Sequence, residues 1–297
     1  MKASFLALDD HAAARGGRPG EEEPCGQGGK GGRARCHLPT LTRSAGAGLN
    51  ILAPDMDRRF VPLHPDGLGL IAYGHHGRPL LAFPSEQGYS HDYESMGMVE
   101  AIADLIVAGR VKLYCVDAVD GQTWHDKSIP LEERARRHGA YEEWIIGAVA
   151  SFIRDDCAGA PEIAVTGPSF GAYHAANFAL KRADLFPLAI CHSGIYDVSA
   201  VGWGDRGNAV YFNNPSDYVR HLHGDHLDWL RTRLNLVIVC GQGQWEDTTG
   251  ALESSKSFAG LLEEKGLRHE LDLWGYDVAH DWPSWSAQLA HHLPRFC

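Results

Sequence analysis

From Phe60 to the end of the chain, short apolar runs alternate with longer stretches whose apolar positions recur every three to four residues. Runs with few polar positions are typical of buried parallel strands, and the longer spacing is typical of amphipathic helices. We expect strands over residues 60–63, 68–73, 79–83, 111–118, 162–166, 188–192, 234–240 and 269–274. We expect helices over residues 93–108, 131–153, 170–181, 251–265 and 283–293.

This alternation predicts an α/β fold, with a mostly parallel sheet of about eight strands and helices on both of its faces. The turn residues Pro65, Asp66 and Gly67 favour an antiparallel pair at the start. The connection 194–233 is too long for a plain loop and carries several aromatic residues. We therefore expect it to form an inserted cap-like segment of an α/β domain that occupies residues 56–297.

The first 55 residues differ from this pattern. The stretch from Gly16 to Gly48 is dominated by Gly, Arg, Pro and Glu and holds few large apolar side chains. Such a segment buries too little surface to offset its ordering entropy. We therefore expect residues 1–55 to be a disordered tail.

Composition and charge exclude several classes of function. The chain has 297 residues, of which 44% are hydrophobic, and a formal net charge of −11. Such an acidic chain repels nucleic acid and anionic membranes, and no apolar run is long enough to span a bilayer. The seven cysteines have no regular spacing, so no disulfide framework is expected. The start has no signal-peptide core, and we expect a cytoplasmic protein that acts on a small molecule; its oligomeric state stays open.

Residues 167–171 read GPSFG and match the pattern G-x-S-x-G. They directly follow the expected strand 162–166 and open a helix that is rich in small residues. This setting is that of a nucleophile elbow, in which a strained turn lifts a serine hydroxyl above the carboxyl edge of a sheet. The flanking glycines relieve crowding in such a turn. We predict Ser169 as a nucleophile; the alternative is a serine that caps an ordinary helix.

A serine that attacks a carbonyl group needs backbone N–H groups to hold the resulting oxyanion. The residue after the nucleophile, here Phe170, supplies one, and the loop after the third strand supplies the other. That loop reads FPSEQG over residues 83–88. We predict the N–H of Glu86 as the second donor, with Gln87 as the alternative.

In α/β folds that carry such a nucleophile elbow, the acid and then the base follow the nucleophile along the chain. His280 lies between the last expected strand and the last helix, so we predict it as the base; a buried structural histidine is the alternative. Glu246 and Asp247 both follow the strand 234–240. We favour Glu246 as the acid, because nearby glycines suggest a turn that buries it, with Asp247 as the alternative and Glu253 as a third choice.

Other side chains near the same expected edge are candidates for a substrate pocket. His91 follows the oxyanion loop, and Trp124 and His125 follow the fourth strand. The histidine-rich stretch 221–226 lacks the fixed arrangement of a metal site, and the chain has neither a Walker pattern nor a G-x-G-x-x-G before a helix. We therefore expect no metal and no cofactor.

Four stretches resemble the putative-esterase branch of the α/β-hydrolases: GPSFGAYHAANFAL (167–180), CHSGIYD (191–197), CGQGQWED (240–247) and GYDVAHDWPSW (275–285). That branch includes esterase D-like enzymes, feruloyl esterases and mycolyltransferases, and the resemblance covers residues 58–297. It implies an α/β-hydrolase fold, a Ser–acid–His triad, a metal-free mechanism and acyl-ester substrates. The loop FPSEQG departs from the His-Gly sequence that many hydrolases have there, which leaves the second oxyanion donor open.

We therefore expect a serine esterase that cleaves carboxylic esters through an acyl-enzyme on Ser169. Two alternatives use the same fold. One is an acyltransferase, in which an alcohol other than water receives the acyl group. The other is a binding protein without catalytic activity, since a fold does not fix a function.

Overall fold

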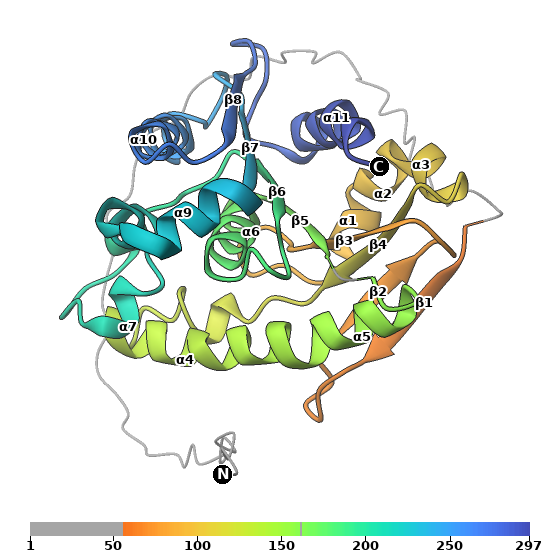
Figure 1. Ribbon diagram of the computed structural model, residues 1–297, viewed down its shortest axis with the longest axis horizontal. Helices are drawn as coiled ribbons and strands as arrows, with labels where there is room; N and C mark the ends of the chain where they lie inside the picture. Colours follow the sequence, from red (N-terminus) through yellow and green to blue (C-terminus); the bar gives the residue numbers. More distant parts are fainter. Residues whose placement is uncertain (1–55, 161) are drawn as a thin grey trace, which may run out of the picture. The chain divides into compact units, whose positions relative to one another are not determined.

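The computed structural model describes residues 56–160 and 162–297, and the predictions made for residues 1–55 lie outside this part. Its centre is an eight-stranded sheet with the order β1-β2-β4-β3-β5-β6-β7-β8 (Figure 1). The strands are β1 (Arg58–Pro62), β2 (Gly69–Tyr73), β3 (Arg78–Ala82), β4 (Val111–Val116), β5 (Ala164–Pro168), β6 (Leu188–His192), β7 (Asn235–Cys240) and β8 (His269–Leu273). The pairs β1–β2 and β2–β4 are antiparallel and the other neighbours are parallel, which confirms the predicted sheet.

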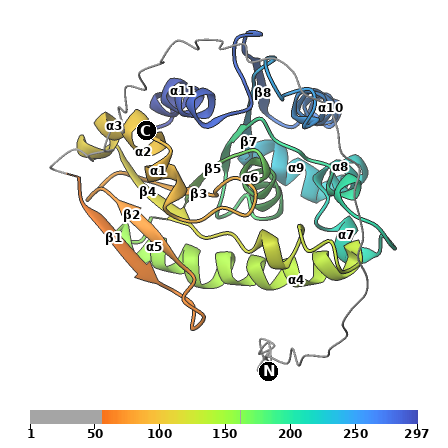
Figure 2. The same cartoon turned by 180° about the vertical axis from the view of Figure 1, so that it is seen from behind.

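Helices cover both faces of the sheet (Figure 2). One face packs against α1 (Asp92–Ser95), α2 (Met98–Ala101), α3 (Ala103–Val107) and α11 (Trp282–His292). The other packs against α4 (Leu131–Trp144), α5 (Ala150–Asp156), α6 (Phe170–Lys181), α9 (Gly224–Arg233) and α10 (Ala251–Glu264). Successive residues of each inner strand enter opposite apolar clusters, as the pleat of a strand requires. The predicted α/β class is therefore confirmed.

The helix predicted over residues 93–108 is wrong as a single element. The three short helices α1 to α3 take its place, and the first break falls at Gly97, whose φ is 82°. A residue in the left-handed region cannot continue an α-helix, and glycine adopts that region without steric cost. The apolar spacing still serves packing, since Met98, Val99 and Ile106 are buried against the sheet.

The helix predicted over residues 131–153 forms a longer rod. A π-helical turn, η2 (Ile145–Val149), joins α4 to α5 without a break, and the rod ends at Asp156. Its inner side contributes Tyr141, Ile153 and other buried side chains to the core. None of the helices in the described part of the chain is long and apolar enough to cross a membrane.

The connection between β6 and β7 contains the segment that we expected to form a cap. It holds the short turns η3 (Val198–Val201), α7 (Asn208–Tyr211), α8 (Pro215–Tyr218) and η4 (Val219–His221), followed by α9. Val198 and Val210 pack with Leu131 of α4, whereas Leu227 and Leu230 of α9 belong to the central core. Since α9 is a crossover helix of the sheet, the cap expected over residues 194–233 stays a prediction for the part before α9.

Parallel strands place the loops that follow them at one edge of the sheet. Glu86 follows β3, Ser169 follows β5, Glu246 follows β7 and His280 follows β8. Loops that are far apart in the sequence therefore meet at the carboxyl edge, and the candidate site lies there.

Candidate active site

Ser169 stands at the sharp turn between β5 and α6. Its φ and ψ are 53° and −118°, a strained combination for a residue with a side chain. A Cβ on Gly167 would lie 2.3 Å from the Gly171 carbonyl group, and a Cβ on Gly171 would lie 2.3 Å from the Pro84 carbonyl oxygen. The Ser169 N–H donates to the His192 carbonyl at 2.8 Å. The turn is thus too tight for larger flanking residues, and it holds the hydroxyl in one direction.

His280 lies beside this hydroxyl although 111 residues separate the two in the chain. Its Nε2 is 3.0 Å from the Ser169 Oγ, and its ring packs edge-on against Trp285 with the centroids 5.0 Å apart. The backbone N–H of His280 donates to the Gln244 carbonyl at 2.9 Å. Ring and backbone are both fixed in the geometry that a general base needs.

Glu246 holds the other ring nitrogen of His280, with Oε2 3.0 Å from Nδ1. This carboxylate is fully buried, and its Oε1 accepts the Ser193 hydroxyl at 2.5 Å and the Gly241 N–H at 3.2 Å. Burial raises the pKa of the Cys240 thiol to about 12, so the thiol stays protonated and donates to Oε2 at 3.4 Å. A carboxylate on Nδ1 selects the tautomer that leaves Nε2 free to take a proton.

The alternative acids Asp247 and Glu253 make other contacts. The Asp247 side chain is exposed and accepts the N–H of Thr248 at 2.8 Å. Glu253 accepts the hydroxyl of Ser257 at 3.0 Å on the exposed side of α10. Of the three acids considered from the sequence, the structure brings Glu246 to the histidine.

The candidate oxyanion donors differ in what their N–H groups already contact. Phe170 begins α6 directly after Ser169, so its N–H has no partner within the helix. The Gln87 N–H is engaged, because it donates to the buried Asp120 Oδ2 at 3.2 Å. The Glu86 N–H has no acceptor among the described residues. Gln87, the alternative second donor, is therefore disfavoured, and Glu86 stays available for a substrate oxygen.

Trp124 does not line a pocket. Its side chain is fully buried and packs against the rings of His138 and Tyr173, with centroids 5.3 Å and 5.8 Å away. A substrate cannot touch a residue with no exposed surface, so the expected role of Trp124 is wrong. The apolar loop residue after β4 serves the core instead of the site.

His125 and His91 lie nearer the surface. The His125 ring packs edge-on against Phe170 at 4.8 Å, and its Nε2 is 3.1 Å from Glu86 Oε1. Burial lowers the pKa of His125, which favours its neutral form. His91 is exposed and stacks on Tyr89, with the centroids 5.6 Å apart. His125 thus contacts both residues that carry the candidate oxyanion donors.

Three polar residues of the site were missed from the sequence. Ser193 donates to Glu246 as described, and Asp120 pairs with His174 at 2.9 Å, where both side chains are buried. Each of them is a polar residue in or beside an apolar segment. Asp120 lies shortly after β4, Ser193 follows β6, and His174 interrupts the alanine-rich α6. That interruption was the available signal, since a buried polar group needs a partner.

Metal-ligating side chains come together at one place in the described part of the chain, where Asp272 of β8 meets His291 and His292 of α11. The His292 Nε2 is 3.0 Å from Asp272 Oδ2, and its Nδ1 is 2.9 Å from a guanidinium nitrogen of Arg295. Both ring nitrogens are engaged and a cation already adjoins the group. We therefore assign no metal role to it.

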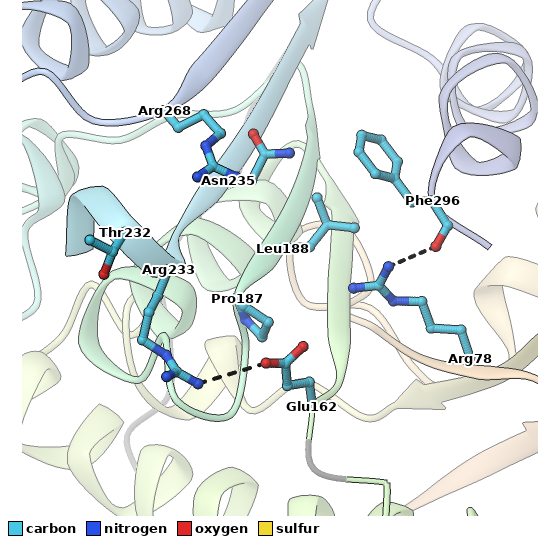
Figure 3. Close-up of a pocket in the computed structure, with 9 residues that line it drawn as sticks. All are labelled: Arg78, Glu162, Pro187, Leu188, Thr232, Arg233, Asn235, Arg268 and Phe296. Atoms are coloured by element: carbon cyan, nitrogen blue, oxygen red, sulfur yellow. Dashed lines mark hydrogen bonds and ion pairs between the residues drawn. The ribbon is translucent and has the colours of Figure 1, made fainter. Parts of the chain in front are cut away.

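A cavity of about 410 Å³ lies away from Ser169, His280 and Glu246, at the edge of the sheet where the parallel strands begin (Figure 3). Arg78, Leu188 and Asn235 in its wall stand at the beginnings of β3, β6 and β7, whereas the candidate site follows the ends of strands. The rest of the wall is mixed, with Arg233 and Arg268 beside Glu162, Pro187, Thr232 and Phe296, and no histidine lines it. The cavity offers no histidine base beside a nucleophile, so the candidate active site remains the group around Ser169.

A family model described as "Putative esterase" matches residues 71–296. Similar solved structures include a ferulic acid esterase, with a TM-score of 0.62 and 16% identity over 81% of this chain and 96% of that chain. The S-formylglutathione hydrolase FrmB from Staphylococcus aureus has a TM-score of 0.57 and 13% identity, with coverage of 81% and 96%. MPT51 (FbpC1) from Mycobacterium tuberculosis has a TM-score of 0.60 and 14% identity, with coverage of 82% and 98%. Such identities show a common fold, and no curated protein matches the chain significantly in sequence.

Proposed function

Because the chain belongs to the family described as "Putative esterase" and is a carboxylic-ester hydrolase, we propose that Ser169, His280 and Glu246 form its catalytic triad. One observation carries this proposal. The imidazole of His280 is 3.0 Å from the Ser169 Oγ on one side and 3.0 Å from the Glu246 Oε2 on the other. A hydroxyl, a base and a buried carboxylate in this order make a serine nucleophilic.

In the first half of the reaction, the Ser169 Oγ attacks the carbonyl carbon of the ester while the His280 Nε2 takes the hydroxyl proton. The carbonyl electron pair moves to the oxygen, and the N–H groups of Phe170 and Glu86 stabilise the resulting anion. When the carbonyl re-forms, the alcohol leaves with the proton from His280. The acyl group stays on Ser169.

In the second half, water takes the place of the alcohol. His280 removes a proton from water as the water oxygen attacks the acyl carbon, and the same N–H groups hold the second oxyanion. Collapse of this intermediate releases the carboxylic acid, and the proton returns to the Ser169 Oγ. The buried charge of Glu246 stabilises the imidazolium in both halves.

Covalent labelling and turnover test the proposal. A fluorophosphonate probe should label the wild type but not Ser169→Ala. Hydrolysis of p-nitrophenyl acetate should fall by about 1000-fold or more in Ser169→Ala and in His280→Ala. His223→Ala, at an exposed histidine outside the site, should keep the wild-type rate. A wild type that is neither labelled nor active would overturn the proposal.

A further inference from the structure

A buried polar pair lies behind the nucleophile and takes no part in the proposed reaction. Asp120 belongs to η1 (Asp120–Gln122) after β4, and His174 belongs to α6, the helix that Ser169 opens. Their side chains have no exposed surface, and Asp120 Oδ1 is 2.9 Å from His174 Nε2. The pair therefore ties the loop after β4 to the nucleophile helix.

The second oxygen of Asp120 reaches the oxyanion loop. Asp120 Oδ2 accepts the Gln87 N–H at 3.2 Å, and Gln87 is held in the left-handed region with a φ of 54°. A non-glycine residue is strained there, so the peptide between Glu86 and Gln87 needs a partner to keep its direction. Asp120 is that partner.

A further contact joins the same two loops. The His125 N–H donates to the Asp120 carbonyl at 2.8 Å, and the His125 ring lies 3.1 Å from the Glu86 carboxylate. The turn after β4 thus holds the oxyanion loop through the backbone of Gln87 and through the side chain of Glu86.

Stability is a poor reason for such a pair. Burying a carboxylate and an imidazole costs desolvation energy that their attraction repays only in part, and apolar replacements of similar size are often as stable. The surroundings of His174 are aromatic, with Phe170, Phe83 and His138 at centroid distances of 5.2, 5.6 and 5.4 Å. Two apolar side chains of similar size would pack well among these rings. What the polar pair adds is the hydrogen bond that the Asp120 carboxylate accepts from the Gln87 N–H.

We propose that Asp120 and His174 are positioning residues of the oxyanion hole. The Asp120 carboxylate binds the Gln87 N–H, so this N–H does not point into the oxyanion hole. The same hydrogen bond fixes the peptide between Glu86 and Gln87 and leaves the Glu86 N–H to bind the substrate oxygen. His174 holds that carboxylate in a fixed position relative to α6, which begins directly after Ser169 with Phe170. This inference rests on the proposed esterase reaction.

Three variants separate a positioning role from a structural one. Asp120→Leu removes the acceptor. Asp120→Asn keeps an amide oxygen for the Gln87 N–H, and its NH2 group can donate to His174 Nε2 because His174 Nδ1 has no partner among the described residues and can carry the proton. Tyr173→Phe is the matched control, since it removes a buried hydrogen bond from the same helix, to the Asn213 carbonyl at 2.9 Å.

We expect Asp120→Leu to lower kcat by about 100-fold with KM nearly unchanged, because a misplaced oxyanion donor affects mainly the transition state. Asp120→Asn should stay within about tenfold of the wild type, since it retains both hydrogen bonds. Tyr173→Phe should lower the melting temperature without lowering kcat.

Binding of phenylboronic acid supplies a second readout. Boron forms a tetrahedral adduct with a serine Oγ and so presents an oxygen to the oxyanion hole. Its inhibition constant should rise in Asp120→Leu by about the factor that kcat loses, since both report the same stabilised oxygen. An unchanged inhibition constant would contradict the positioning role.

If Asp120→Leu does not accumulate as folded protein, His174→Leu carries the test, because it cuts the tie to α6 and leaves the acceptor for Gln87 in place. It should lower kcat by about tenfold at constant KM. Full activity of either folded leucine variant would overturn the inference while leaving the triad intact. A wild type without esterase activity would overturn the proposed function and the inference together.

Discussion

Glu246 and Asp247 are neighbours in the sequence but differ in what a catalytic carboxylate needs. Glu246 has no exposed surface and accepts hydrogen bonds from His280, Ser193 and Gly241. Asp247 points to solvent and bonds only its own turn in the described structure. A buried, multiply bonded carboxylate keeps its position during the reaction, whereas an exposed one is screened and mobile.

Replacing these two acids separately should therefore affect kcat very differently. Glu246→Gln keeps the shape but removes the charge that orients and stabilises the histidine, and we expect kcat to fall by about 100- to 10,000-fold. Asp247→Asn should leave kcat within about twofold of the wild type. Steady-state hydrolysis of p-nitrophenyl acetate checks both. A strong loss in Asp247→Asn with an active Glu246→Gln would mean that the acid is misassigned.

The hydroxyl of Ser193 is expected to hold the Glu246 carboxylate in position beside His280. It donates to the Oε1 of Glu246 at 2.5 Å, and both groups are buried. Ser193→Ala should lower kcat by about tenfold at constant KM, since a hydrogen bond to a buried charge is worth about 1.5–3 kcal/mol. Ser257→Ala removes a similar bond, to Glu253 at 3.0 Å on an exposed helix face, and should not change kcat. Equal rates for the two variants would contradict a supporting role for Ser193.

At the scale of elements, glycine has opposite roles in α6 and α10. A methyl group on Gly171 would lie 2.3 Å from the Pro84 carbonyl oxygen, so Gly171→Ala must push the oxyanion loop away from the nucleophile helix. We expect a loss of about 1–3 kcal/mol in the free energy of unfolding and a lower kcat. Gly260 of α10 has nothing within 4 Å of an added Cβ, so Gly260→Ala should stabilise the protein by about 0.5–1 kcal/mol. Urea denaturation measures both, and a stabilised Gly171→Ala would show that the elbow has room.

The sequence predicted elements well where their cause is local. The strand β6 begins and ends where expected, because a short apolar run between Pro187 and Ser193 is a local pattern. The helix over 93–108 failed because the left-handed conformation of Gly97 breaks a pattern that is otherwise helical. The oxyanion loop was left open for a different reason. The direction of the Gln87 N–H is set by Asp120, 33 residues away, and such a contact leaves no trace in local spacing.

At the scale of the whole domain, both layers that flank the sheet enclose a neutral histidine. His138 of α4 is buried on the side of α6, and burial lowers its pKa well below the ordinary value of 6.5. His192, at the end of β6, contacts Gln288 of α11 on the other side, and burial lowers its pKa to about 3. Unfolding would expose both rings to water, where they bind protons more readily.

Acid should therefore destabilise the fold through these histidines. Since the folded pKa of His192 lies below its unfolded value, its contribution is fully present above about pH 6.5 and is lost as the pH falls toward 3. At about pH 5 the loss amounts to roughly 2 kcal/mol, because one pKa unit corresponds to about 1.4 kcal/mol. His192→Gln cannot take up a proton, so its free energy of unfolding should drop less than that of the wild type between about pH 7.5 and pH 5, by about that amount. His223→Gln, at an exposed position, should follow the wild type. Urea denaturation at both pH values decides the matter: the same drop in wild type and His192→Gln would mean that folding does not lower the pKa of His192.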